Sequence, residues 1–545
     1  MASMLTLGKD ASVVGPDEGK EVFAYVPNAV ISKELASLGD KNYSHQYFVD
    51  GVTQYNDVFY NGGWHSVLVG ATGGGATTEV GGANGTGGKG VFALDVSHAD
   101  SFSASDVLWE FTSRNNSDLG YTIPVPIIAR MANGHWAAIV ANGYNSGGGK
   151  AALFIIDIQT GTPIQTGGCA TPPCQAIIAE SAGSNGLSSP TAVDVSGDGI
   201  TDYIYAGDLK GNMWKFDVTN TDPANWGVAY SSSQASPSPM FVALDGASVR
   251  QPITSKPAVS KAKATDQHSG VMVYFGTGKY FEDGDHAVPS DPQVQSIYGI
   301  WDKCDKSSAS NCNGVVSGRS ALQQQSIIAE TSGTTTLSDG TTTTTADQSV
   351  RVTSKCEVAY GSTVPTTLTT PCTNSINRLG WFMDLVQPPN GTKQAERVVS
   401  TPIIRNTAVV FVTLIPTNAT CEPSGTGWVM ELDFNGARFT GSPIDINNDG
   451  RIDAHDLIKL SDGTLAAASG LGSKVGIIKT PAVVGTEVGR EQKYLSGSGS
   501  TTGETEQDFG ETAPTDPDEP TCDPTNPRAC AASHGPIRSS WRQLR

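Results

Sequence analysis

The segment DINNDGRIDAHD, residues 445–456, has the residue types and the spacing of a calcium-binding loop. In a twelve-residue calcium loop, side-chain oxygens stand at positions 1, 3, 5, 9 and 12, and position 7 contributes its backbone carbonyl. Gly450 occupies position 6, where the chain must turn sharply. The expected ligands are Asp445, Asn447, Asp449, Arg451 through its carbonyl, Asp453 and Asp456. The alternative is an Asp/Asn-rich turn whose side chains cap their own backbone.

A second, shorter loop of the same kind is DVSGDGITD, residues 194–202. Its expected ligands are Asp194, Ser196, Asp198, Ile200 through its carbonyl, and Asp202. Position 12 is Tyr205, and the segment runs straight into the strand DYIYAGD, so we expect a compact nine-residue loop in which Asp202 closes the coordination. A turn whose side chains cap their own backbone is the alternative interpretation here too, because serine is a weaker ligand than Asp or Asn.

Both loops favour Ca²⁺ over Mg²⁺. Each loop offers three or more carboxylates, whereas Mg²⁺ prefers to keep several water molecules as ligands. Binding would cancel carboxylate repulsion and be coupled to folding of the loop. Catalytic motifs give no competing interpretation. GTGGKG (85–90) matches GxGxxG, but a strand follows it where a dinucleotide site needs a helix, and the sequence contains neither HExxH nor GxSxG. We therefore expect no enzyme.

The elements that must position these loops are short strands. Apolar strands that end in Asp and a turn recur at 91–97, 152–161, 212–220 and 428–436. Strands rich in small residues come before a turn at 64–75, 136–149, 202–211, 270–280 and 408–417. Paired as hairpins at intervals of roughly 60 to 80 residues, they predict the blades of an all-β propeller. An irregular β-sandwich is the alternative. The tryptophans, Trp64 included, are expected to pack between blades.

Composition agrees with this architecture and narrows the partners. Of 545 residues, 62 are glycine and 30 proline, which favours strands and tight turns. A net charge of −19 excludes nucleic acid and anionic membrane as electrostatic partners. No apolar run is long enough to span a bilayer, so no direct membrane insertion is expected.

Eight of the nine cysteines form close pairs, which predicts local disulfides made in an oxidising compartment. The pairs are Cys169 with Cys174, Cys304 with Cys312, Cys356 with Cys372, and Cys522 with Cys530, and Cys421 is left over. The chain is therefore interpreted as a piece of an exported protein whose export signal lies outside it.

Several segments interrupt the hairpins. A short helix is expected within 30–45 and another at DLIKL after the longer loop, and the Thr/Ser/Gly run 331–347 is expected to be a flexible insertion. The predicted domains are 1–20, a cloning-derived start and an incomplete first blade; 21–503, the propeller; 504–534, an acidic, proline-rich mobile segment; and 535–545, a strand docking back on the propeller.

Several segments carry a resemblance to a known family. They are FAYVPNAV…GGKGVFALDVS…VLWEF (23–111), DVSGDGITDYIYAGDLKGNMWKFDV (194–218), VYFGTGKYFEDGD…QSIYGIWD (273–302), GWFMDL…VVFVTLIPTNATC (380–421) and IRSSWRQL (537–544). On these the chain resembles the PilY/PilC family of type IV pilus biogenesis factors and tip adhesins.

The resemblance implies a modified, quinoprotein-dehydrogenase-like propeller of about seven blades with loop insertions. It implies a secreted virulence factor at the pilus tip, outer-membrane surface or periplasm of a Gram-negative bacterium. Minor pilins would be its partners and a host-cell receptor a further one, with roles in adhesion, twitching motility and the balance of pilus extension and retraction. In the family this balance is linked to Ca²⁺ in the nine-residue loop, here Asp194 to Asp202. Its pattern has Asp or Asn where this chain has Ser196.

Two other functions stay open. A quinone-dependent dehydrogenase would share the superfold, although no two cysteines are adjacent as they often are in those enzymes. The loop 445–456 could also serve carbohydrate binding or scaffold docking, although it lacks the duplicated loop of a dockerin.

Overall fold

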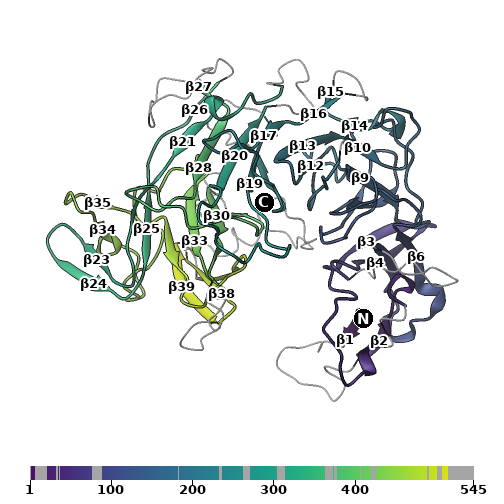
Figure 1. Ribbon diagram of the computed structural model, residues 1–545, viewed down its shortest axis with the longest axis horizontal. Coiled ribbons are helices and arrows are strands. Elements are labelled where there is room, and N and C mark those ends of the chain that lie inside the picture. The colour runs from purple at the N-terminus through teal and green to yellow at the C-terminus, as the bar shows by residue number, and fades with distance from the viewer. Residues whose placement is uncertain are drawn as a thin grey trace, which may run out of the picture.

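The structure is a computed structural model, and strands joined by turns and short 3-10 helices make up its ordered elements (Figure 1). It describes residues 2–5, 21–31, 35, 37–75, 89–181, 183–231, 236–261, 270–303, 314–361, 372, 377–405, 407–418, 425–487, 490–499 and 506–512.

The hairpins predicted from the recurring strands are confirmed, and each pair is antiparallel. They are β4 (Gly63–Ala71) with β5 (Gly90–Asp95), β8 (Trp136–Ala141) with β9 (Ala151–Asp157), β12 (Tyr203–Gly207) with β13 (Asn212–Asp217), and β30 (Ala408–Val412) with β33 (Trp428–Asp433). The predicted strand at 270–280 is β19 (Val271–Gly276), and it pairs with β20 (Ser296–Asp302).

The aspartate that ends each strand has a structural role. Its carboxylate accepts a hydrogen bond from the backbone N–H two residues further on, which closes an Asx-turn. The four pairs are Asp95 with Ser97 (3.0 Å), Asp157 with Gln159 (3.1 Å), Asp217 with Thr219 (3.0 Å) and Asp433 with Asn435 (3.0 Å). The recurring Asp at the strand end therefore marks the same Asx-turn in successive sheets.

Around these hairpins the strands form successive sheets. The four-stranded sheets are β3 (Gln54–Tyr60)-β4-β5-β6 (Val107–Thr112) and β10 (Ile177–Glu180)-β9-β8-β7 (Ile127–Arg130). Two five-stranded sheets follow: β11 (Thr191–Val193)-β12-β13-β14 (Gly227–Val228), with β17 (Phe241–Val242) also on β13, and β18 (Ala258–Lys261)-β19-β20-β28 (Gly380–Asp384)-β21 (Gln323–Gln325).

The later sheets combine strands that lie far apart in the sequence. They are β22 (Ile327–Glu330)-β25 (Val350–Thr353)-β36 (Gly470–Gly472)-β33-β30-β29 (Ile403–Arg405), β24 (Thr343–Ala346)-β23 (Thr335–Ser338)-β34 (Ile458–Lys459)-β35 (Leu465–Ala466), and β37 (Ala482–Glu487)-β38 (Arg490–Ser496)-β39 (Glu506–Thr512).

Smaller elements complete the chain. Two-stranded ladders join β1 (Ala2–Leu5) to β2 (Glu21–Tyr25), β15 (Tyr230–Ser231) to β16 (Pro237–Ser238), β26 (Ala359–Tyr360) to β27 (Asn377–Arg378), and β31 (Ile415–Pro416) to β32 (Gly425–Thr426). The 3-10 helices are η1 (Asn28–Val30), η2 (Ser37–Gly39), η3 (Ala99–Ser101), η4 (Ala104–Asp106), η5 (Pro223–Asn225), η8 (Arg319–Ala321) and η9 (Ala454–Asp456).

Neighbouring sheets pack face to face, as blades of a propeller do. One apolar cluster joins the β3–β6 sheet to the β7–β10 sheet, and there the rings of Phe111 and Phe154 lie 5.3 Å apart. The next cluster joins the β7–β10 sheet to the sheet of β12 and β13. In Figure 1 the sheets follow one another along an arc from β3–β6 to β38 and β39. The all-β propeller prediction is confirmed, and the number of about seven blades stays a prediction.

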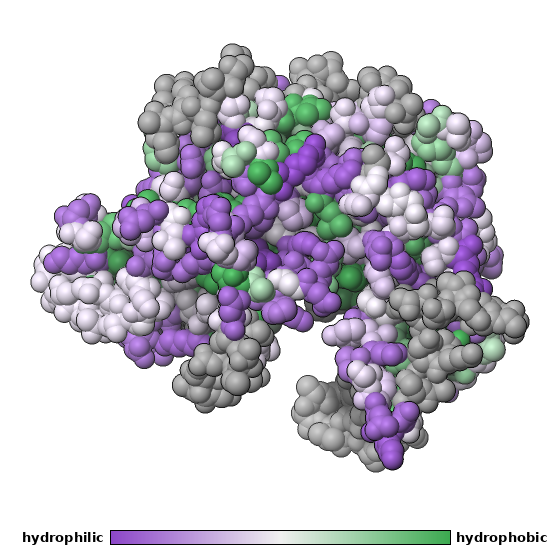
Figure 2. All heavy atoms as spheres, in the orientation of Figure 1, coloured by the Kyte–Doolittle hydropathy of each residue, from purple (hydrophilic) through white to green (hydrophobic). Residues whose placement is uncertain are grey.

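The surface agrees with buried sheet interfaces. Hydrophilic residues cover most of the face in Figure 2, and hydrophobic residues form small, separate patches on it. Among the described residues, no helix has the length and apolar character needed to cross a membrane.

Burial agrees with the expectation for Trp109, Trp136, Trp214, Trp301, Trp381 and Trp428. For Trp64 the prediction is wrong, because 68% of this residue is exposed on β4. Its strand is only partly covered, and the alternation of the strand turns the indole outward.

The Thr-rich run 331–347 is not a flexible insertion, and that prediction is wrong. Residues 335–338 and 343–346 form the β23–β24 hairpin, which pairs with β34 through Leu337 and Ile458. Leu337 is fully buried, and this burial fixes the hairpin against the body.

Of the two short helices expected from the sequence, the one at DLIKL needs correction. After the longer loop, DLIKL continues into β34 and not into an α-helix. The helix expected within 30–45 agrees with the described residues, which are helical at Leu35 and in the 3-10 helix η2, and residues 32–34 and 36 lie outside the described part.

The mobile segment predicted from residue 504 is wrong at Glu506–Thr512, which pair with β38 as strand β39. The rest of that segment, the docking strand at 535–545 and most of 1–20 lie outside the described residues.

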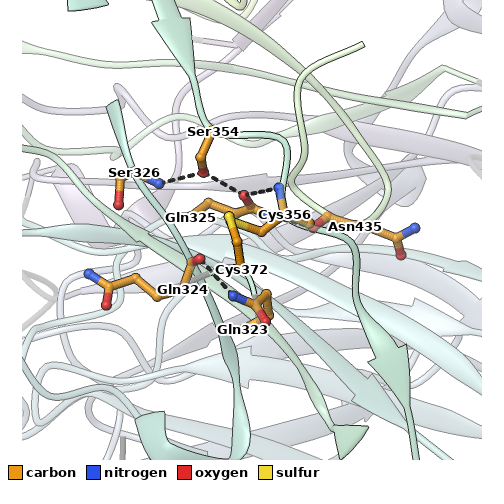
Figure 3. Close-up of a disulfide and its surroundings, with 8 residues drawn as sticks. All are labelled: Gln323, Gln324, Gln325, Ser326, Ser354, Cys356, Cys372 and Asn435. Atoms are coloured by element: carbon orange, nitrogen blue, oxygen red, sulfur yellow. Dashed lines mark hydrogen bonds between the residues drawn. A yellow bond between two sulfur atoms is a disulfide. The ribbon is translucent and has the colours of Figure 1, made fainter. Parts of the chain in front are cut away.

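Two predicted disulfides are present, Cys169–Cys174 and Cys356–Cys372. Figure 3 shows the second beside Gln325, a buried side chain. The amide of Gln325 donates to the carbonyl oxygens of Cys356 (2.7 Å) and Asn435 (3.1 Å), so it ties the bridge to the turn after β33. Cys304, Cys312, Cys421, Cys522 and Cys530 lie outside the described residues.

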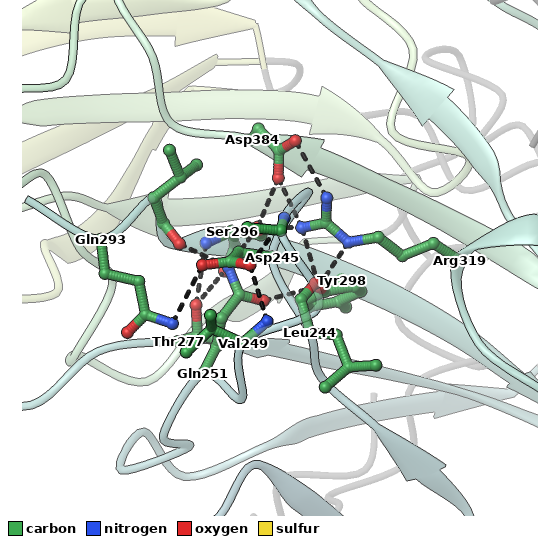
Figure 4. A network of polar contacts seen from close by, with 12 residues as sticks. Leu244, Asp245, Val249, Gln251, Thr277, Gln293, Ser296, Tyr298, Arg319 and Asp384 are labelled. Atoms are coloured by element: carbon green, nitrogen blue, oxygen red, sulfur yellow. Dashed lines mark hydrogen bonds and ion pairs between the residues drawn. The ribbon is translucent and has the colours of Figure 1, made fainter.

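A polar network links η8 to strands β20 and β28 (Figure 4). The guanidinium of Arg319 donates to both carboxylate oxygens of Asp384, at 2.6 and 3.1 Å, and the Ser296 hydroxyl donates to the same carboxylate at 2.6 Å. Burial raises the pKa of Tyr298, which accepts from Arg319, to about 12. The bidentate geometry fixes η8 on the sheet.

Asp384→Ala is expected to lower the free energy of unfolding by about 2 kcal/mol, because it leaves a largely buried guanidinium without its carboxylate. Denaturant titration measures this loss. The matched control is Asp291→Ala, which removes the exposed pair between Lys393 and Asp291 and should cost at most about 0.5 kcal/mol. Equal losses in the two variants would contradict the structural role of the network.

Candidate calcium loops

The loop 194–202 connects two strands of one sheet. It follows β11 and precedes β12, and these strands pair antiparallel with Val193 opposite Tyr203. The N–H of Asp202 donates to the carbonyl of Val193 at 2.9 Å, which closes the base of the loop. Gly197 and Gly199 have φ values of 78° and 83°, a region that favours glycine. The sequence thus folds here into a tight loop on a rigid base.

Inside this loop the backbone wraps around two carboxylates. Asp194 accepts from the N–H groups of Gly197 (2.6 Å) and Gly199 (2.6 Å). Asp202, which is fully buried, accepts from Val195 (3.0 Å) and Ser196 (3.1 Å). The first and the last predicted ligand are therefore both held by backbone N–H groups of the same small loop.

The other predicted ligands of this loop lie nearer the solvent. The Ser196 hydroxyl donates to Asp194 at 3.2 Å, and Asp198 accepts from the N–H of Ile200 at 2.9 Å. Both Ser196 and Asp198 are exposed. The carbonyl of Ile200 stays a predicted ligand.

The loop 445–456 is built on an apolar base. Ile444 and Ile446 are buried and belong to the same core cluster as Leu337 and Ile458. The loop lies between strands β33 and β34, and Gly450 turns it with a φ of 78°.

The longer loop is closed in the same way as the shorter one. Its first predicted ligand, Asp445, accepts from the N–H groups of Asp449 (3.2 Å) and Gly450 (2.9 Å). Its last, Asp456, is fully buried and accepts from Ile446 (2.8 Å) and Asn447 (3.3 Å). Asp202 and Asp456 thus make equivalent contacts with the backbone, and the role of Asp202 as the ligand that closes the coordination stays a prediction.

Asp453, the predicted ligand at position 9, has a different set of contacts. Its carboxylate caps η9 by accepting from the N–H of His455 at 2.8 Å, and the same oxygen lies 2.7 Å from the imidazole Nδ1. These contacts lower the pKa of Asp453 and raise that of His455. Asn447 and Asp449 accept from backbone N–H groups within the loop, and the carbonyl of Arg451 stays a predicted ligand.

The sequence pattern missed the neighbours of this loop. His455 Nε2 lies 3.3 Å from Asp339 at the turn of the β23–β24 hairpin, and the N–H of Ser338 donates to the carbonyl of Leu457 at 2.9 Å. The sequence signal for that hairpin is the pair Asp339-Gly340, which lies in the four-residue connection 339–342 between Ser338 and its partner Thr343.

The donor set fits a hard divalent cation, because each loop offers oxygen ligands only. In the longer loop, burial raises the pKa of Asp456, and the nearby negative charge of Asp445 raises it further. A cation between these carboxylates would relieve both effects. In their present positions, no three His, Cys, Asp or Glu side chains of the described residues are grouped as metal ligands. Binding would therefore require side chains such as Asp198 and Asp453 to turn inward.

Gly450→Ala is expected to weaken calcium binding about fivefold, because a side chain in the left-handed region costs about 1 kcal/mol. An added Cβ meets nothing within 4 Å, so strain of the backbone is the whole effect. Gly463→Ala is the matched control, since Gly463 has a φ of 84° and equally open surroundings after β34. Calorimetry should show weaker binding for Gly450→Ala alone, and weakening by both would contradict the assignment.

Comparison with known proteins places this arrangement in a family. The family model described as the PilY1 beta-propeller domain matches residues 13–340. The chain belongs to the PilY1 β-propeller family. The matched residues include the shorter loop and the blades on both sides of it.

Relatives and one solved structure of the PilY1 family cover most of the chain. A type IV pilus biogenesis factor PilY1 homolog of Xylella fastidiosa is 36% identical over 423 residues, which is 76% of this chain and 25% of the relative. The type IV pilus biogenesis factor PilY1 of Pseudomonas aeruginosa PAO1 is 34% identical over 455 residues, or 80% of this chain and 35% of the relative.

The crystal structure of the P. aeruginosa PilY1 C-terminal domain superimposes with a TM-score of 0.64 at 28% identity, covering 91% of this chain and 89% of that one. The chain spans about a quarter to a third of the length of the curated PilY1 relatives. Their names support pilus biogenesis and not the dehydrogenase alternative.

Proposed function

We propose that this chain is the calcium-dependent propeller module of a type IV pilus biogenesis factor, without catalytic activity of its own. The full protein would be exported to the pilus tip or cell surface and act there with minor pilins. Adhesion to a host-cell receptor would be a second role of the same protein.

The observation that carries this proposal is identity of 34% to 36% over most of the chain to proteins named type IV pilus biogenesis factors. The calcium part is supported by the donor chemistry of the two loops and by their common closure through Asp202 and Asp456.

The mechanism would be a shift of population. The carboxylates of a loop repel one another, so Ca²⁺ favours the conformation in which they converge. A coupling of about 1 to 3 kcal/mol between that conformation and the partner surface would bias pilus extension over retraction.

The test uses the full-length protein in the bacterium that encodes it. Deletion of the gene should abolish surface pili and twitching, and the parent gene should restore both. Asp198→Ala removes a central ligand whose side chain is exposed, so we expect it to leave the fold intact and to remove the calcium dependence of twitching.

Asp291→Ala is the matched control, because it removes an exposed aspartate away from both loops and should behave as the parent. Normal piliation in the deletion strain would overturn the pilus role. Calcium dependence that persists in Asp198→Ala would overturn the role of the shorter loop alone.

A further inference from the structure

Two aromatic side chains lie exposed side by side on the first sheet. Trp64 on β4 is 68% exposed, and Phe59 lies directly opposite it on β3 with 47% exposure. Their rings meet edge to face at 5.5 Å, and Trp64 also lies edge to face with Trp136 of the next sheet, at 6.3 Å. Exposed apolar side chains that lie next to one another form a patch, and such a patch is more informative about an interaction site than single exposed side chains are.

Beside these rings is an open depression of about 280 Å³ between two neighbouring sheets. Three turns surround it: the β3–β4 turn at Asn61, the β7–β8 turn at Asn133 to His135, and the turn after β9 at Asp157 to Gln159. Phe59 and Trp136 form part of its wall, so the exposed indole of Trp64 stands at its edge.

The polar groups of the depression are held in place before any ligand arrives. The Gln159 amide donates to the Asn61 side chain at 3.1 Å, which bridges the two sheets. The His135 ring lies 2.7 Å from Asp157, whose other carboxylate oxygen accepts from the N–H of Gln159. Such prior organisation lowers the entropy cost of binding.

We propose that this depression binds a neutral carbohydrate. The C–H face of a pyranose ring would pack on the aromatic side chains of Phe59 and Trp64, because an aromatic face is the negative side of its quadrupole. Sugar hydroxyls both donate and accept, and the side chains of Asn61, Gln159 and His135 offer both functions.

The residues of the depression also argue against other ligands. They include a carboxylate and no lysine or arginine, which disfavours phosphates and acidic sugars. The volume is just below the roughly 300 to 1,000 Å³ of pockets for drug-sized ligands, which suits one or two sugar rings. The residues that line the depression belong to neither calcium loop, and its nearest link to the shorter loop is the hydrogen bond from the N–H of Thr201 to the carbonyl of Arg130 at the end of β7 (2.9 Å).

The test is a titration of the full chain with maltotriose, cellotriose and chitotriose, followed by tryptophan fluorescence and by saturation-transfer NMR. Sialyllactose is the acidic comparison, and a proline-rich peptide tests a protein ligand. We expect saturable binding of at least one neutral trisaccharide, with Trp64→Ala weakening it at least tenfold.

Tyr494→Ala is the matched control, because Tyr494 is 47% exposed on the distant strand β38, and it should bind as the parent does. If Trp64→Ala does not fold, Phe59→Ala and Gln159→Ala answer the same question through exposed side chains. The proposal is overturned if no neutral trisaccharide binds, if binding survives these changes, or if only sialyllactose or the peptide binds.

Discussion

Asp302→Ala is expected to lower the free energy of unfolding by about 3 to 5 kcal/mol, because it leaves a buried ammonium group without its counter-charge. The carboxylate of Asp302 lies 2.7 Å from Lys215 Nζ, and both side chains are almost fully buried. It also accepts from the hydroxyls of Tyr205 (2.6 Å) and Tyr230 (3.0 Å), whose pKa values are raised by burial and by this negative charge.

The group joins two blades, since Lys215 is on β13 and Asp302 on β20. The ammonium also lies 3.8 Å from the centre of the Tyr203 ring, which gives it a cation–π contact. Loss of the carboxylate should therefore loosen the interface between the third and fourth sheets.

Denaturant titration measures the loss, and the double variant Asp302→Ala with Lys215→Met is the control. Removing both charges replaces an unpaired buried ion by an apolar side chain, which should recover at least half of the stability. A loss below about 1 kcal/mol in the single variant, or no recovery in the double variant, would contradict this account.

Calcium is expected to stabilise the folded chain by about 2.7 kcal/mol for each loop that it fills, when its free concentration is about 100 times Kd. Asp202→Asn and Asp456→Asn each keep the shape of the buried closing residue and an oxygen that accepts from the backbone, but remove its charge. The calcium-dependent gain should therefore be halved in either variant and absent in the double variant.

The measurement is the denaturation midpoint with calcium and with chelator. Asp222→Asn is the matched control, because Asp222 caps the 3-10 helix η5 outside both loops. The same gain in the double variant as in the parent would show that calcium acts elsewhere.

The local part of the fold could be predicted from the sequence, because its signals are local. Each strand-Asp-turn segment contains its own turn chemistry, as in Asp157 accepting from Gln159 two residues later. The four hairpins with short or medium connections could be predicted from these turn residues and from the alternation of apolar and polar residues along the strands. The disulfides Cys169–Cys174 and Cys356–Cys372 were likewise predictable from short spacing.

The long-range part could not be predicted in the same way. The β23–β24 hairpin is polar along most of its length, and it is held by contacts with residues far along the chain, among them the burial of Leu337 against Ile458. Sheet edges are decided by tertiary packing too: Trp64 has the sequence context of a core residue and lies exposed.

In the candidate calcium loops, too, the local contacts could be predicted from the sequence and the long-range contacts could not. Spacing identifies Asp194, Asp202, Asp445 and Asp456, because each loop contains its own closing contacts. Spacing does not reveal that His455 engages Asp453, because that contact depends on the 3-10 turn of η9 and on the nearby Asp339.

Isothermal titration calorimetry of Ca²⁺ on the calcium-free chain tests most directly whether both loops hold the ion. The parent should bind two ions, each of the variants Asp202→Asn and Asp456→Asn one, and the double variant none. Absence of binding to the parent, or the same stoichiometry in all four proteins, would contradict the assignment of the two loops as calcium sites.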